Sequence, residues 1–250
     1  MTAQSEQRLA VLIDADNAAA KNLKPIMDEV AKYGVPTIKH AYGDWASLAG
    51  WKEALLEIGA VPIQQYAYTK GKNATDSALI IEAMDILHEN VVDGFVLVSS
   101  DSDFTPLALR LRESGKKVYG IGEKKTPRPF ITACDKFIYV EILSSDTLPP
   151  VEQNEDEGAK SPAASAKAQK KPISISDADV RFLAQCISEA AGESYQCLLS
   201  ALGSMINKKR PDFDSRSYGY SQLSKLLREI PRFEVGGNGA RIWVKDKEAK

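Results

Sequence analysis

Hydrophobic and polar positions follow two alternating periods along the first 143 residues. Short, fully apolar runs such as LAVLID (9–14) and GFVLVSS (94–100) indicate strands buried on both faces, and apolar residues three and four positions apart indicate amphipathic helices. Strands that alternate with helices are typical of a parallel sheet covered by helices, an α/β fold. The pattern predicts strands at 9–14, 35–43, 60–68, 94–100, 117–122 and 137–143, and helices at 22–34, 47–58, 75–89 (with Thr75 as its N-cap) and 106–115.

The pattern changes after residue 143. Residues 144–172 contain few large apolar side chains and many Pro, Ala, Ser and charged residues, which predicts a flexible linker. Beyond the linker, the sequence predicts helices at 175–191 and 194–209, a third helix capped by Ser221, and a hairpin in RFEVGGNGARIWV. Three helices and a hairpin describe a winged helix. We therefore expect an α/β domain at 1–143, a linker at 144–172 and a small winged-helix domain at 173–250.

Composition places the chain among ordinary globular proteins, with 44% hydrophobic and 26% charged residues. No apolar run approaches the roughly 20 residues that a membrane-spanning helix needs, and the first residues lack the features of an export signal. The three cysteines have no spacing that suggests a disulfide framework or a zinc site. These features predict a cytoplasmic protein with no membrane partner. The net charge of −2 is unusual for a nucleic-acid binder unless some of the acids hold cations.

Four aspartates are expected to converge at one edge of the predicted sheet. Asp14 ends the first strand, Asp101 and Asp103 follow the fourth, and Asp76 lies in the first turn of the helix that leads to the fourth strand. With a strand order of 3-2-1-4-5, the first and fourth strands are neighbours and their end-loops meet. A single Asp in such a position is more often a helix cap or a turn residue. Three separate converging segments favour a shared site instead.

Carboxylates gathered in this way repel one another, and a hard divalent cation removes the repulsion. Mg²⁺ or Mn²⁺ prefers such oxygen ligands, and a cation site of this kind can promote the hydrolysis of a phosphodiester. All four aspartates are therefore candidate metal ligands and catalytic residues, with Asp14 and Asp101 ranked first. Neither His40, in a predicted strand, nor His88, at the end of a helix, is placed to act as a catalytic base.

The segments IDADN, KGKNATDSALIIEAMDIL and VLVSSDSDFTPLALRLRESGKKVYGIG together resemble the NYN domain of the LabA-like group, within the PIN-like nucleases. The resemblance covers about residues 8–143. It implies a PIN-like, mainly parallel sheet with helices on both faces, a bound Mg²⁺ or Mn²⁺ ion and ribonuclease activity. The family's acids match the four aspartates, its frequent Asn matches Asn17, which either orients Asp14 or caps the next helix, and its small polar residue matches Ser100.

Basic residues near the acids are candidates for RNA contacts. Lys72 and Arg128 lie in loops that should open near the acidic edge, although lysines in loops are often only solvated.

The sequence KKRPDF followed by SYGYSQLSKLL resembles the OST-HTH domain, also called LOTUS. That resemblance implies binding of RNA or of a protein partner through the winged helix. Its predicted RNA-binding residues, by their charge, are Lys209, Arg210, Arg216, Lys225 and Arg241. The choice between RNA and protein partners, and self-association of the chain, stay open.

Three other readings compete with a metal-dependent ribonuclease. IDADN is superficially similar to the DxDxT of haloacid-dehalogenase-like phosphatases, but Ala18 stands at the Thr position. SDSD is similar to the DxD of toprim domains, which place a Glu after their first strand, where this chain has Asp14. A non-catalytic RNA-binding adaptor or regulator that uses both domains is the more serious alternative, since intact acids do not guarantee turnover.

Overall fold

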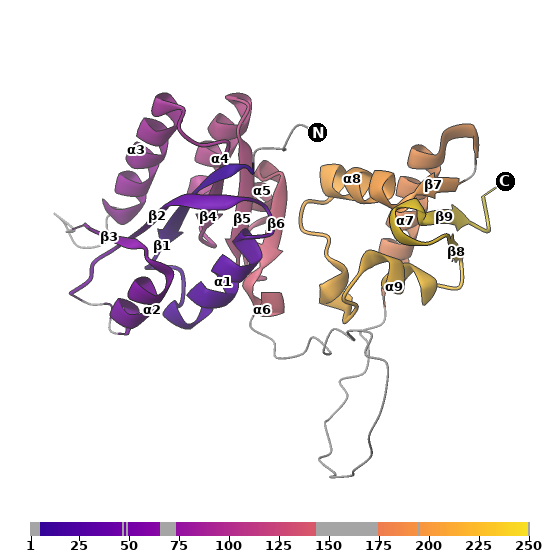
Figure 1. The fold of residues 1–250 in the computed structure, drawn as a ribbon, viewed down its shortest axis with the longest axis horizontal. Coiled ribbons are helices and arrows are strands. Elements are labelled where there is room, and N and C mark those ends of the chain that lie inside the picture. Colours follow the sequence, from indigo (N-terminus) through magenta and orange to yellow (C-terminus); the bar gives the residue numbers. More distant parts are fainter. Residues whose placement is uncertain are drawn as a thin grey trace, which may run out of the picture. The chain divides into compact units, whose positions relative to one another are not determined.

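The computed structural model describes residues 6–65 except 47 and 49, and then 74–143, 175–194 and 196–249. The chain forms two compact units, each built around a sheet of its own (Figure 1). Lys72, the second half of the strand predicted at 60–68 and the linker predicted at 144–172 lie outside the described residues. Those predictions therefore stay predictions.

The first unit is built on a six-stranded sheet in the order β3-β2-β1-β4-β5-β6, in which every neighbouring pair is parallel. The predicted α/β architecture is confirmed, with the sixth strand at one edge. The strands are β1 (Arg8–Asp14), β2 (Val35–Gly43), β3 (Val61–Gln64), β4 (Gly94–Val98), β5 (Lys117–Gly122) and β6 (Lys136–Tyr139). The helices are α1 (Leu23–Val30), α2 (Trp51–Ile58), α3 (Ala74–Glu89), α4 (Thr105–Glu113), α5 (Arg128–Ala133) and α6 (Val140–Leu143), with short 3₁₀ turns η1 (Ala20–Asn22) and η2 (Ser102–Phe104).

Helices cover both faces of this sheet (Figure 1). Leu12 of β1 packs in the core formed with α3, α4 and α5, and its neighbours Val11 and Ile13 pack in the core formed with α1, α2 and α6. Successive side chains of a strand point to opposite faces, so a strand covered on both sides must be apolar throughout. This explains why β1 and β4 appear in the sequence as continuous apolar runs.

Several helix boundaries differ from the sequence prediction. The helix predicted at 47–58 begins at Trp51, directly after Gly50, whose φ of 82° ends the preceding turn. Thr75 lies inside α3, which already includes Ala74, so its predicted role as the N-cap is wrong. The six-residue helix α5 was not predicted, because its sequence RPFITA is too short to show helical periodicity.

The C-terminal part of the chain contains α7 (Asp177–Ala191), α8 (Leu199–Lys209) and α9 (Leu223–Arg228) and an antiparallel sheet in the order β7-β9-β8. It forms the second unit, except that Ile206–Phe213, with the end of α8, belongs to the first. Its strands are β7 (Gln196–Leu198), β8 (Phe233–Gly236) and β9 (Trp243–Asp246), with 3₁₀ turns η3 (Gly192–Ser194), η4 (Ser215–Tyr218) and η5 (Gly239–Arg241). The predicted winged-helix arrangement is confirmed, with two changes. Residues 196–198 form a strand where a helix was predicted, and the N-cap of α9 is Gln222, not Ser221.

Candidate metal centre

The acidic residues stand where the order of the strands reverses. The chain runs outward from β1 to β2 and β3, and then returns to β4 beside β1 before it continues to β5 and β6. Ile13 of β1 pairs with Val98 of β4, so Asp14 and Ser99 leave the sheet side by side. Open α/β sheets bind ligands outside the carboxyl ends of their strands at such a reversal.

Asp14 is fully buried at the end of β1 and accepts several hydrogen bonds. Its Oδ2 accepts from the hydroxyl of Ser99 at 2.7 Å and from the side-chain amide of Asn17 at 2.8 Å. Its Oδ1 accepts from the backbone N–H groups of Asp16 and Asn17. Burial raises the pKa of Asp14 above its ordinary value, and the bonds from Ser99 and Asn17 oppose that rise. The carboxylate is therefore held in one orientation by four donors.

Asp101 and Asp103 follow β4 in the tight turn η2. Asp101 is the N-cap of η2, and its Oδ1 accepts from the backbone N–H of Asp103 at 2.9 Å. The backbone N–H of Asp101 donates in turn to the hydroxyl of Ser99 at 3.0 Å. The hydroxyl of Ser99 thus bonds both to Asp14 and to the segment that carries Asp101. Ser99 was not predicted as a site residue.

Asp76 faces this pair from the first turn of α3. One carboxylate oxygen each from Asp76, Asp101 and Asp103 lies within 4.8 Å of the other two. Burial, followed by the charges of Asp14, Asp101, Asp103 and Asp16, raises the pKa of Asp76 to about 6. Among the described residues, these three form the group of acids close enough to share an ion. Asp14 is not part of that oxygen group, although its charge reaches Asp76.

The donor set fits a hard divalent cation. All three groups offer carboxylate oxygens, which Mg²⁺ and Mn²⁺ prefer over nitrogen or sulfur. Opposite ligands around Mg²⁺ lie roughly 4 Å apart, so oxygens within 4.8 Å of one another need only small side-chain rotations to share an ion. Burial contributes most to the raised pKa of Asp76, and the uncompensated negative charges around it, which a bound cation would neutralise, raise it further.

The other residues predicted for the site are Asn17, Ser100 and Arg128, and of these Asn17 bonds to one of the acids. Asn17 is exposed and bonds to Asp14 as described above. The hydroxyl of Ser100 accepts from the backbone N–H of Glu123, so it joins the loop after β4 to the loop after β5 instead of bonding to an acid. Arg128 is exposed at the start of α5.

The basic residues predicted to contact RNA in the C-terminal part of the chain fall into two groups. Lys209 at the end of α8, Lys225 on α9 and Arg241 in η5 are exposed. Arg216 is mostly buried and donates from Nε and Nη2 to both oxygens of Asp214. The guanidinium of Arg210 lies 5.6 Å from the centre of the Phe213 ring. Arg216 is therefore part of the local structure, whereas Lys225 and Arg241 are exposed.

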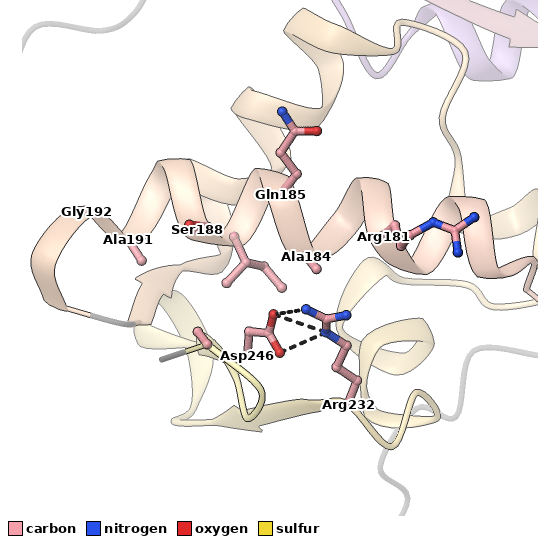
Figure 2. A pocket seen from close by; sticks show the side chains of 10 residues that line it. Arg181, Ala184, Gln185, Ser188, Ala191, Gly192, Arg232 and Asp246 are labelled. Atoms are coloured by element: carbon pink, nitrogen blue, oxygen red, sulfur yellow. Dashed lines mark hydrogen bonds and ion pairs between the residues drawn. The ribbon is translucent and has the colours of Figure 1, made fainter.

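The second unit also contains a hollow of about 640 Å³ between α7 and the end of β9 (Figure 2). Arg232 and Asp246 line it, and Arg232 donates from Nε and Nη2 to Asp246 at 2.9 and 2.7 Å. Burial alone would raise the pKa of Asp246, but the hydrogen bonds from Arg232 and the backbone N–H of Glu248 lower it below its ordinary value. This ion pair joins β9 to the residue before β8, which gives it a structural role.

Within the described part of the chain, no helix combines the length and the apolar character needed to cross a lipid bilayer.

Two solved structures are similar to parts of this chain. A solved structure of a protein of unknown function from Vibrio parahaemolyticus is similar at 20% identity and a TM-score of 0.47, covering 55% of this chain and 94% of the other. An uncharacterized protein from Nitrosomonas europaea is similar at 24% identity and a TM-score of 0.28, covering 38% of this chain and 95% of the other. No curated protein matches the chain.

Two family models match the two halves of the chain. The model of the OST-HTH/LOTUS domain matches residues 175–244. The model of the NYN domain matches residues 8–143, which contain the sheet and all four aspartates. The chain therefore belongs to the NYN domain family and carries a C-terminal OST-HTH/LOTUS domain.

Proposed function

We propose that this chain is a ribonuclease that hydrolyses RNA phosphodiester bonds with the help of Mg²⁺ or Mn²⁺, and that its winged-helix domain holds the RNA. The observation that carries the proposal is the meeting of Asp76, Asp101 and Asp103 at the strand reversal of an NYN domain. An NYN domain implies a nuclease, and an OST-HTH/LOTUS domain suggests RNA binding.

In this proposal the four acids divide into two roles. Asp76, Asp101 and Asp103 hold the ion directly, because their oxygens already lie close together. Asp14 supports them from the buried end of β1 through its charge and through Ser99, which also bonds to the backbone of Asp101. The sequence ranked Asp14 and Asp101 first as ligands, and the geometry favours Asp76 and Asp103 beside Asp101.

The bound ion would supply charge neutralisation for the phosphate and activation of water, which carboxylates alone cannot provide. The protein's own contribution is to hold the aspartate side chains in position. Asp101 is held by its N-cap geometry, Asp14 by four donors, and Asp76 by the packing of α3 against β1 and β2. Neither histidine offers a base at this site, since His40 bonds to Glu82 and His88 stands near the far end of α3.

A cleavage assay with matched variants tests this proposal. The full chain is incubated with single-stranded and structured RNA in Mg²⁺, Mn²⁺ or EDTA, together with Asp76→Asn, Asp101→Asn and Asp14→Asn. Asp85→Asn serves as the control, because Asp85 is an exposed acid on the same helix as Asp76. Loss of even an outer-shell group at a metal site costs about 10- to 100-fold, so each substituted ligand should lower cleavage by roughly a hundredfold or more.

The control should match the parent, and EDTA should stop cleavage by both. Products formed without a divalent cation, or acid variants as active as the parent, would contradict the proposal. RNA binding without cleavage under every metal condition would instead support the non-catalytic adaptor.

A further inference from the structure

The three-stranded sheet of the second unit has one covered and one open face. Cys197, Val244 and Phe233 point inward and are buried. Their neighbours point outward, so Leu198 of β7, Trp243 of β9 and Gly236 of β8 form a row across the open face, each directly paired with the next. Leu198 is 50% exposed and Trp243 is half-buried. The open face therefore carries an aromatic ring with an exposed aliphatic side chain beside it.

Gly236 determines how the indole of Trp243 lies. A Cβ atom at Gly236 would come within 2.3 Å of Cζ2 and 2.6 Å of Cε2 of Trp243. The ring thus passes directly over the glycine backbone, which only a residue without a side chain permits. Cζ2, Cε2 and Cη2 of the indole therefore lie against Gly236. Trp243 is half-buried, so part of its indole is accessible for stacking with a planar ligand.

Cations flank this surface on the same short segment of chain. Lys245 lies two residues beyond Trp243 on the open face, with Gln196 and Glu234 paired on either side of it. Arg241, two residues before Trp243, is exposed in η5. Glu234 balances one of the two positive charges, which leaves one net positive charge beside the ring. A ligand with a planar apolar group on a negatively charged backbone matches this combination.

We propose that the open face of this sheet, the Leu198–Trp243–Gly236 row, binds single-stranded RNA by stacking an unpaired base on Trp243. Leu198 contacts the edge of the base or its ribose, and Arg241 and Lys245 contact the flanking phosphates. Aromatic side chains on which unpaired bases stack are a general means of binding single strands. The inference rests on the proposed function, since it assigns the RNA binding of the winged-helix domain to a particular surface.

The test separates base stacking from phosphate contacts. Binding of the full chain is measured by fluorescence anisotropy in EDTA, which prevents cleavage, with a short labelled oligoadenylate and with an abasic ribose-phosphate strand of equal length. The variants are Trp243→Leu, Trp243→Phe and Leu198→Ser. Leu198 is half exposed, so Leu198→Ser leaves the core intact. The matched control is Leu56→Ser, which changes another exposed leucine, on α2 of the NYN domain.

The parent and Leu56→Ser should bind oligoadenylate more tightly than the abasic strand. Trp243→Leu should weaken oligoadenylate binding about five- to 150-fold, the range that loss of one stacked base gives, and leave abasic binding unchanged. Leu198→Ser should weaken it less, and Trp243→Phe, which keeps an aromatic face, should restore most of the preference. Thermal melts of each variant verify that the domain is folded.

Trp243→Leu and Leu198→Ser variants that keep the parent's preference for oligoadenylate would overturn the inference, as would a parent with no preference. Either result leaves the proposed function standing if the parent still binds the abasic strand and still cleaves RNA with a divalent cation. A parent that binds neither strand would refute both this inference and RNA binding by the winged helix. The cleavage assay would then still decide the role of the NYN domain.

Discussion

At the scale of single residues, burial and the nearby negative charges make Asp76 harder to ionise. Burial and the nearby acids raise its pKa to about 6, from an ordinary value of 3.8. The folded protein therefore holds this proton more tightly than the unfolded chain does. A cation that binds Asp76 must displace the proton, so metal binding and protonation compete at this carboxyl.

We expect the metal-free protein to lose unfolding free energy at this residue as the pH rises from about 4 to about 6. Below that window Asp76 is protonated in both states, and above it the folded state carries an unfavourable charge. Urea unfolding in EDTA across this range should show a steeper loss for the parent and for Asp85→Asn than for Asp76→Asn. Added Mg²⁺ or Mn²⁺ should restore stability mainly above pH 6. Identical pH slopes for the parent and Asp76→Asn would contradict this expectation.

The convergence of the aspartates could be predicted from the sequence, but the hydrogen bond of Ser99 to Asp14 could not. Asp14, Asp101 and Asp103 follow buried apolar runs, and the carboxyl ends of parallel strands must lie at one edge of the sheet. Beyond the last residue of a strand, however, the regular alternation of side chains ends. Nothing in the pattern therefore distinguished Ser99, which bonds to Asp14, from Ser100, which bonds to the loop after β5.

At the scale of elements, the end of β5 supports the loop that follows β4. A Cβ atom added to Gly122 would lie 2.5 Å from the carbonyl oxygen of Ser99 and 2.9 Å from the hydroxyl of Thr126. The backbone of Ser99 cannot move away without displacing its hydroxyl, which bonds to Asp14. The position of the acidic site therefore depends on a glycine in the neighbouring strand.

We expect Gly122→Ala to lower metal-dependent cleavage by up to about a hundredfold, because displacements of about 1 Å at an active site have effects of that size. The added methyl group should also destabilise the fold by about 1–3 kcal/mol through overpacking. Cleavage rates and thermal melts measure the two effects. Gly203→Ala is the control, since a Cβ atom there meets nothing within 4 Å. Equal cleavage by Gly122→Ala and the parent would show that β5 does not set the site's geometry.

The long elements were predictable and the short ones were not. Strands such as β1 and β4 are buried on both faces, and α3 spans 16 residues, so their periodicity is clear. The helix α5 and the strand β7 contain six and three residues, too few to show a period. Strand β7 forms because β9 offers it an antiparallel edge, a tertiary effect that a local pattern does not contain.

At the scale of the whole molecule, two units of different chemistry belong to one chain. The first carries the acidic cluster, and the second carries the exposed Lys225 and Arg241. Tethering two binding modules raises the effective concentration of a ligand held by one at the other. Both units could be anticipated from the sequence, because each shows its own run of periodic elements.

Deleting residues 173–250 should weaken RNA binding by roughly a hundredfold, within the range that tethering provides, and leave part of the metal-dependent cleavage. Both cores of the NYN domain's sheet consist of residues between 9 and 143, so the shortened chain keeps them. Affinity measurements and cleavage time courses on the two proteins, at one salt concentration, check this. Equal affinity of the full and shortened chains would refute the tethering model.

The strands that carry Asp14 and Ser99 are the two innermost of the six, paired on both sides and covered on both faces. Their amide hydrogens exchange with solvent only when the whole sheet opens, whereas the first turn of α3, which carries Asp76, can fray on its own. The acidic cluster thus combines residues that follow the rigid inner strands with Asp76, which lies on a helical turn that we expect to open locally. In the proposed metal site, we therefore expect the conformational entropy lost on cation binding to come mainly from that helical turn.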